Sequence, residues 1–235
     1  MKIAILSPVW FPVPPTRYGG IEWIVSLLAE GLVRAGHDVT LFASGDSSTS
    51  AKLEAVYKEA PSDKIGTTHY ELRHALSCFE RAGDFDVIND HSGPLGATLG
   101  GTVETAVVHT VHGPLGGEPG LVYESLARVA PRVGLISLSM NQRKPLPELN
   151  WVANCPNALE LEVYPVSPHR GDYLLFLGRM SADKGAHRAI EVAKEAGLPL
   201  LLAGKMQDAA EKEYFEAHVR PNLGYGIEYL GEVDH

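Results

Sequence analysis

The sequence predicts an α/β protein in which a doubly wound, parallel sheet is followed by a smaller second unit of the same kind. Short apolar runs of strand length alternate with segments whose apolar residues recur at helical spacing. Such alternation is typical of a parallel sheet covered by helices on both faces. A polar stretch with two prolines, at 164–172, interrupts the pattern and predicts a domain boundary. We therefore expect one domain at 1–166 and a second at 167–235.

The first domain begins with a strand, a helix and a second strand. Residues 3–6 form an apolar run, and a loop with four prolines, 8–20, separates them from the helix-spaced apolar series at 21–35. Gly36 then stands where a glycine commonly ends a helix, and strand character resumes at 39–43. Further strands are expected at 53–57, 86–89, 105–109, 134–138 and 151–154, and further helices at 67–82, 94–100, 121–129 and 141–146.

The second domain repeats this pattern on a smaller scale. Three strands and two helices make up only part of a doubly wound domain, so the chain is expected to be truncated within it. The strands are predicted at 173–177, 200–203 and 227–230, and the helices at 183–196 and 208–218.

Composition excludes several classes of function. The chain has 235 residues, of which 45% are hydrophobic and 21% charged, as is ordinary for a soluble globular protein. Its formal net charge of -9 argues against a nucleic-acid partner, because binding a phosphate backbone needs a concentrated positive surface. Two cysteines, Cys78 and Cys155, are too few for a disulfide framework, which favours a reducing compartment. Only four apolar residues lie between Lys2 and Ser7, too few for a signal peptide, so a cytoplasmic location is predicted unless the protein rests on a membrane surface.

The segment that says most about function spans residues 172–185. An apolar strand ends at Gly178 and Arg179, and Lys184 and Gly185 open the next helix. The intervening loop lies at the carboxyl end of a strand, which is the edge where open α/β sheets bind ligands. An arginine, a lysine and a helix amino terminus at one place form a receptor for a phosphate or diphosphate. The alternative is that both cations are solvated surface charges.

A pair of glycines, Gly19 and Gly20, precedes the first helix. Glycines at this position let a phosphate approach the backbone amides at the positive end of the helix. The spaced third glycine of a dinucleotide fingerprint is missing, which makes an NAD-dependent dehydrogenase the least favoured class of enzyme. Because paired glycines also mark ordinary tight turns, both interpretations stay open for this segment alone.

Three histidines stand at the ends of predicted strands. His91 follows one strand, and His109 and His112 lie at the end of another. A histidine at the ligand-binding edge can donate or accept a hydrogen bond near neutral pH, although a structural role remains the alternative for His91 and His109. Gly113 beside His112 permits a ligand to approach the backbone closely. No third ligand with suitable spacing lies nearby, so no metal site is predicted. The Gly-x-Ser-x-Gly motif of serine hydrolases is absent from the sequence.

Taken in order, these segments resemble the family-4 retaining glycosyltransferases, whose two Rossmann-like domains form the GT-B fold. The resemblance extends over essentially the whole chain and is carried by an ordered set of motifs: Tyr18 to Glu22, Asp86 to His91, Thr110 to Gly113, Asn157, and Phe176 to Gly185. It implies a complete N-terminal Rossmann-like sheet and a partial second one.

The resemblance implies an enzyme that moves a hexose from a nucleotide-diphosphate sugar to a hydroxyl acceptor with retention of configuration. The implied catalytic residues are His112, which reaches a donor hydroxyl or the reacting centre, and Arg179 and Lys184, which hold the donor diphosphate. No cofactor or metal is implied. The implied substrate-binding residues are Gly19, Gly20, His91, Gly113, Asn157, Gly178, Gly204 and Lys205.

Two other functions stay open at this stage. A non-catalytic remnant would bind a nucleotide feebly and turn over nothing, whereas a nucleotide-sugar epimerase of GT-B architecture would form product without any acceptor. The donor nucleotide is UDP, GDP or ADP. The acceptor is a sugar, a lipid or another small molecule, and peripheral association with a membrane stays open with it.

Overall fold

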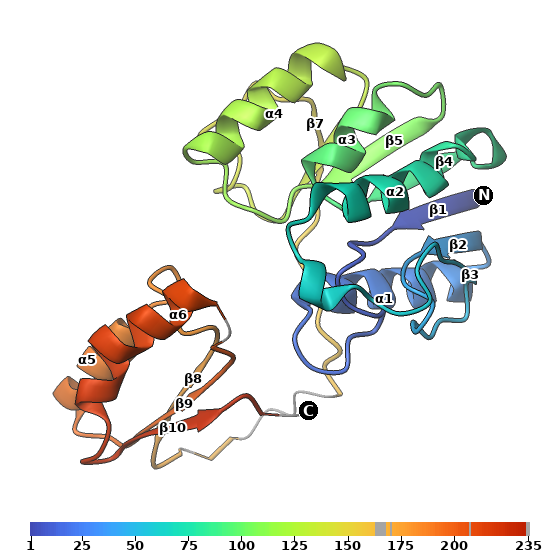
Figure 1. The fold of residues 1–235 in the computed structure, drawn as a ribbon. Coiled ribbons are helices and arrows are strands. Elements are labelled where there is room, and N and C mark those ends of the chain that lie inside the picture. The colour runs from blue at the N-terminus through green and yellow to red at the C-terminus, as the bar shows by residue number, and fades with distance from the viewer. Residues whose placement is uncertain (163–167, 170, 207, 234–235) are drawn as a thin grey trace. The chain divides into compact units, whose positions relative to one another are not determined.

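The computed structural model describes the whole chain apart from residues 163–167, 170, 207 and 234–235 (Figure 1). The chain divides into two compact units, Met1–Leu161 and Glu162–His235. The boundary predicted between residues 166 and 167 falls outside the described residues. Each unit is an α/β structure with its own hydrophobic core, so each is described by itself.

The first unit is built on a seven-stranded sheet with the order β3-β2-β1-β4-β5-β6-β7. All neighbouring strands are parallel. The order proceeds outward from the centre in both directions along the sequence, which confirms a doubly wound sheet and places its switch point between β1 and β4. The strands are β1 (Lys2–Leu6), β2 (Asp38–Phe42), β3 (Lys52–Glu54), β4 (Val87–Asp90), β5 (Ala106–Thr110), β6 (Gly134–Ser137) and β7 (Trp151–Asn154).

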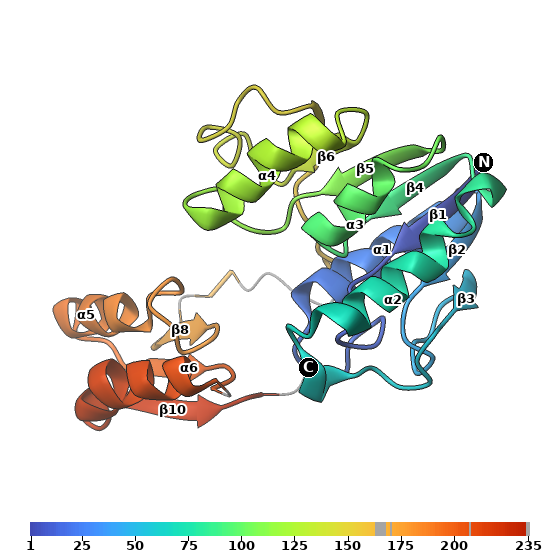
Figure 2. The same ribbon diagram turned by 45° about the horizontal axis from the view of Figure 1, so that its top comes forward.

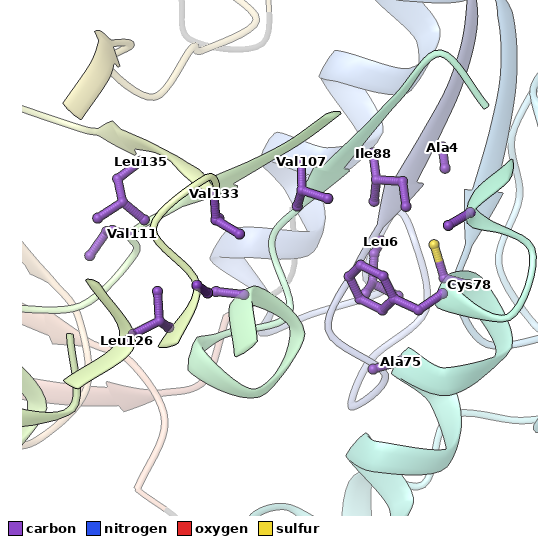
Figure 3. Packing of buried hydrophobic residues seen from close by; sticks show 14 of the residues in the cluster. Ala4, Leu6, Ala75, Cys78, Ile88, Val107, Val111, Leu126, Val133 and Leu135 are labelled. Carbon is purple, nitrogen blue, oxygen red and sulfur yellow. The ribbon is translucent and has the colours of Figure 1, made fainter. Parts of the chain in front are cut away.

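Helices cover both faces of this sheet (Figure 1). Ile3 and Ile5 of β1 pack against α1 (Gly20–Arg34). Ala4 and Leu6 belong to the cluster with the helices of the other face, where Figure 3 shows them near Ala75 and Cys78. The alternation follows from the pleat of a strand, in which successive side chains point to opposite faces. The helices of that face are α2 (Thr68–Phe79), α3 (Pro94–Gly100) and α4 (Glu118–Val129), and short 3-10 turns lie at η1 (Ser62–Lys64) and η2 (Ala82–Asp84).

The second unit contains a three-stranded parallel sheet with the order β10-β9-β8. Both of its longer helices lie on one side of the strands (Figures 1 and 2). Leu200 and Leu202 are buried on that side, whereas Leu175 and Leu177 are more than half exposed. The elements are β8 (Leu174–Leu177), α5 (Ala186–Ala196), β9 (Leu200–Ala203), α6 (Ala209–Tyr214), the π-helical turn η3 (Phe215–Val219), the 3-10 turn η4 (Arg220–Asn222) and β10 (Ile227–Gly231).

The predicted elements are confirmed with one clear error. Residues 141–146 form turns, not a helix. The side chain of Gln142 in this segment accepts a hydrogen bond from the backbone of Leu138 and donates to the carbonyl oxygens of Val111 and Gly113. Pro145 lacks an N–H group for a helical hydrogen bond, so the segment folds as a connector. In the described part of the chain, no helix combines the length and the apolar character that crossing a bilayer requires.

Candidate functional site

The carboxyl ends of β1, β4 and β5 bring together several of the residues singled out in the sequence. His91 follows β4, and its backbone N–H donates to the carbonyl oxygen of Leu6 at the end of β1, 2.8 Å away. Asp90 of β4 is level with His109 of β5, so the residues that follow each strand emerge side by side. This edge includes the switch point of the sheet, where ligands bind in doubly wound folds.

His91 and His112 are in direct contact at this edge. Nδ1 of His91 lies 2.9 Å from Nε2 of His112, and the ring centroids are 5.1 Å apart. Burial and, to a smaller extent, the neighbouring His112 lower the pKa of His91 to about 3. Burial also lowers the pKa of His112 to about 4, with a smaller contribution from His109. Both imidazoles are therefore neutral at neutral pH, and each carries a single N–H.

A fully buried polar network lies next to the histidine pair. Nδ1 of His109 lies 2.7 Å from a carboxylate oxygen of Asp90, and Nε2 of His109 lies 2.8 Å from the hydroxyl of Tyr123 on α4. Ser92 donates both its backbone N–H and its hydroxyl to the second oxygen of Asp90. Burial acts to raise the pKa of Asp90, but His109 and Ser92 outweigh it and hold that pKa below its usual value.

This network decides between the two interpretations of the histidines. His109 is 0% exposed and its two ring nitrogens both have partners within the protein, so it is structural. Asp90, Ser92 and Tyr123 were not predicted as part of the site. They fix the ends of β4 and β5 and thereby the positions of His91 and His112.

The glycine pair forms the start of α1. Gly19 has φ +152°, and a Cβ atom there would lie 2.6 Å from Cβ of Pro15, so only glycine fits. A Cβ atom at Gly20 would meet nothing within 4 Å, which leaves the backbone of the first helical turn open to a ligand. Glu22 in the same turn is buried, and burial raises its pKa to about 7 although a hydrogen bond from its own backbone N–H opposes the shift.

Arg179 lies directly after β8 in the second unit and is held by two carboxylates. Its Nη1 lies 3.5 Å from Oε1 of Glu211, and its Nη2 lies 3.3 Å from Oδ2 of Asp183. Glu211 is almost fully buried, so this partner is fixed, and 32% of the Arg179 side chain stays exposed. Nε of Arg179 is buried without a hydrogen-bond partner among the described residues. Lys184 is exposed five residues further on.

Two glycines bring the loops after β8 and β9 into close contact. A Cβ atom at Gly204 would lie 1.8 Å from the carbonyl oxygen of Gly178, and Gly204 has φ +151°. The backbone N–H of Met180 donates to the carbonyl oxygen of Lys205 across the same contact. Gly178, Arg179, Gly204 and Lys205 therefore share one edge of this sheet.

Among the predicted site residues of the first unit, the structure brings His91 and His112 into contact, and in the second unit it brings the loops of Gly178 and Gly204 together. Gly113 is exposed beside His112, and its carbonyl oxygen accepts a hydrogen bond from Gln142. Asn157 lies in an exposed segment after β7. Across the described ranges, no group of three or more His, Cys, Asp or Glu side chains is placed to hold a metal ion.

A comparison with protein-family models matches more than half of the chain. The family model described as Glycosyltransferase Family 4 matches residues 18–143, which include the glycine pair and the contacting histidines His91 and His112. The crystal structure of AviGT4, a glycosyltransferase involved in avilamycin A biosynthesis, is similar with a TM-score of 0.66 and 26% identity. The match covers 100% of this chain and 64% of AviGT4, so the chain spans less than two thirds of that protein. The comparison with curated proteins found no match.

More distant structures are similar in fold alone. The catalytic domain of starch synthase IV from Arabidopsis thaliana, bound to ADP and acarbose, matches with a TM-score of 0.63 and 11% identity over 100% of this chain and 74% of that one. UDP-N-acetylglucosamine 2-epimerase from Rickettsia bellii matches with a TM-score of 0.57 and 10% identity over 100% of this chain and 69% of that one.

Proposed function

Because this chain belongs to glycosyltransferase family 4 and has the GT-B type of fold, we propose that the whole protein transfers a hexose from a nucleotide-diphosphate sugar to a hydroxyl acceptor with retention of configuration. The observation that carries the proposal is the partly open guanidinium of Arg179, oriented by two carboxylates at the carboxyl edge of its sheet. A guanidinium group in this setting suits a ligand that carries more negative charge than a single carboxylate. A diphosphate is such a ligand.

In this proposal, the cations act on the leaving group. The bond between the anomeric carbon and the diphosphate oxygen breaks with its electron pair on that oxygen, so negative charge builds up on the nucleoside diphosphate. Arg179 and Lys184 stabilise this charge more in the transition state than in the bound substrate, which accelerates the reaction. The acceptor oxygen forms the new bond to the anomeric carbon, and its proton passes to an oxygen of the departing diphosphate.

The other predicted residues contact the remaining parts of the donor. The open backbone at Gly20, next to Gly19, offers amides to a phosphate oxygen, as helix amino termini commonly do. The tight contact between Gly178 and Gly204 shapes the edge at which Lys205 meets the nucleotide, and Asn157 is a further substrate contact. His112 hydrogen-bonds a hydroxyl of the donor sugar, with Gly113 beside it.

The proposed reaction uses cationic side chains, not a metal ion, to neutralise the diphosphate. Chelation with EDTA is therefore expected to leave turnover unchanged, and a loss of activity restored by Mg²⁺ or Mn²⁺ would contradict this part of the proposal. The proposed location is the cytoplasm, with peripheral binding to a membrane if the acceptor is a lipid.

Site-directed variants test the diphosphate clamp. Turnover of UDP-, GDP- and ADP-hexoses by the complete protein is compared for Arg179→Ala, Lys184→Ala and the control Arg220→Ala, whose guanidinium pairs with the exposed Glu216. Removal of one group that stabilises a transition-state charge is expected to lower kcat by about 100-fold or more, and the control should match the unchanged protein. Unchanged turnover in the Arg179→Ala, Lys184→Ala double variant would refute the clamp.

The epimerase is the second candidate because UDP-N-acetylglucosamine 2-epimerases share the fold. An epimerase changes the donor sugar without an acceptor, whereas a transferase forms product only when an acceptor is present. Product analysis by NMR with and without acceptor separates them, and the configuration at the anomeric carbon of a transfer product tests retention.

A further inference from the structure

His91 touches a ligand-binding candidate, His112, but is itself enclosed by the protein. Its side chain is 4% exposed and uses Nδ1 in the contact with Nε2 of His112. Its other ring nitrogen, Nε2, is buried with no hydrogen-bond partner among the described residues. We propose that His91 is a positioning residue, which fixes the orientation and the tautomer of His112 through Nδ1 and contacts no substrate itself.

The chemistry of two neutral imidazoles explains how such a contact works. A neutral ring has one N–H and one lone pair, so a hydrogen bond between two rings joins the N–H of one to the lone pair of the other. If His91 donates, His112 carries its proton on Nδ1. If His112 donates, its Nδ1 is a lone pair. Because a buried N–H without a partner is rarer than a buried acceptor without one, we assign the lone pair to Nε2 of His91, so that His91 donates from Nδ1 and His112 carries its proton on Nδ1.

Nδ1 is also the nitrogen that His112 keeps for a ligand. His112 is only partly buried, and its Nδ1 makes no hydrogen bond to any residue that the structure describes. A ligand hydroxyl at this edge of the sheet therefore meets a ring whose second nitrogen is already engaged. Fixing the ring in this way holds Nδ1 in the orientation that the reaction needs, so losing the support should lower kcat more than donor binding.

His91 is well placed to act as a support because its own backbone is fixed. Its N–H is bonded to β1, and the preceding Asp90 is held by His109 and by Ser92. A buried nitrogen without a hydrogen-bond partner is unusual, since most buried polar groups are paired. It therefore does not explain why a histidine occupies this position. The imidazole at position 91 is explained by the one bond that it does make, to His112.

NMR of the 235-residue chain tests the tautomer independently of activity. Long-range ¹H–¹⁵N correlations of the His112 ring, assigned by their loss in His112→Gln, are expected to show one neutral tautomer. His91→Asn, whose amide reaches the Nδ1 position, should preserve it, whereas His91→Leu should give a mixture. His69→Leu, at an exposed histidine, is the control and should change nothing. A mixture of tautomers in the unchanged protein, or a single one in His91→Leu, would overturn the proposal.

Kinetics of the complete protein test the consequence, which rests on the proposed function. Loss of a group that orients a functional side chain typically costs about 10- to 100-fold in activity. We therefore expect kcat to fall by that factor in His91→Leu and in His91→Gln, whose amide occupies the Nε2 position, with donor KM almost unchanged. His91→Asn should keep kcat within about threefold of the original value. This remaining loss is smaller than the loss expected when the orienting group is absent. Equal losses in the Asn and Leu variants, both with unchanged melting temperature, would show that Nδ1 is not what matters.

The two experiments separate the failure of this inference from the failure of the proposed function. If the complete protein transfers no sugar, the NMR comparison still confirms or refutes the fixed tautomer. If transfer is observed and the tautomer proves to be mixed, only the role of His91 is wrong.

Discussion

A buried carboxyl group makes the stability of the first unit depend on pH. Glu22 in the first turn of α1 is 4% exposed, and burial raises its pKa from 4.5 to about 7. The folded state therefore holds this proton more tightly than the unfolded state does. As pH rises from about 4.5 to about 7, the unfolded carboxyl ionises first, so the free energy of unfolding decreases, and the decrease persists at higher pH. A difference of about 2.5 pKa units at about 1.4 kcal/mol each corresponds to roughly 3 kcal/mol.

Glu22→Gln removes this effect because the amide is neutral at every pH. The variant and the unchanged protein should have similar stability at pH 4.5, and the variant should be about 3 kcal/mol more stable at pH 8. Urea unfolding followed by tryptophan fluorescence measures this directly. All three tryptophans, Trp10, Trp23 and Trp151, lie in the first unit, so the signal reports that unit alone.

A matched control is Glu118→Gln, in the first turn of α4, where the side chain is exposed. Because its side chain is exposed, Glu118→Gln removes no buried carboxyl group, and its gain in stability at pH 8 should be far smaller than that of Glu22→Gln. If Glu22→Gln shows the same difference in unfolding free energy at pH 4.5 and pH 8, Glu22 does not titrate as a buried group and the reasoning is refuted.

Three further predictions concern the packing and the reactivity of individual residues. Gly204→Ala should destabilise the second unit by at least 2 kcal/mol or so, because the new methyl overlaps a backbone carbonyl oxygen at a positive φ; an unchanged melting temperature would contradict this. His109→Leu should cost the first unit about 3–5 kcal/mol in urea unfolding, because it leaves Asp90 buried without its partner; a loss below about 1 kcal/mol would count against the network. A thiol reagent should modify the exposed Cys155 in the folded protein and Cys78 only after unfolding, because Cys78 is buried and burial raises the pKa of its thiol. Modification of both thiols in the folded protein would contradict this prediction.

Local pattern was enough to predict most of the fold. The apolar series at 21–35 has the period of a helix over four turns, and α1 is found there. The error at 141–146 arose because the sequence does not show that Gln142 bonds to three backbone groups of neighbouring loops. Such contacts are long-range, and they override a weak local preference.

The candidate site could be predicted only in part. His91 and His112 were each predicted at a ligand-binding edge, but their contact joins residues 21 positions apart and depends on the register of β4 with β5. Tyr123 reaches His109 from a helix whose amphipathic pattern predicts only that a tyrosine faces the core. Glu22 belongs to a recognised motif, yet its burial depends on the packing of the loop before α1. The sequence pattern therefore predicted which edge of the sheet carries the histidines, but not the buried polar residues that contact them.

The pKa values of the site residues indicate how the two groups divide the chemistry. The burial that lowers the pKa of His112 to about 4 keeps this ring neutral at physiological pH. A neutral imidazole has no electrostatic preference for a diphosphate over a hydroxyl, so it suits a sugar hydroxyl better than a phosphate. Arg179 carries a permanent charge and suits the diphosphate. A protonated ring at His112 would instead place a positive charge in contact with the buried His91, which costs free energy. The burial of the histidine pair thus accounts for a neutral His112, which agrees with the role in hydroxyl binding that we propose for it.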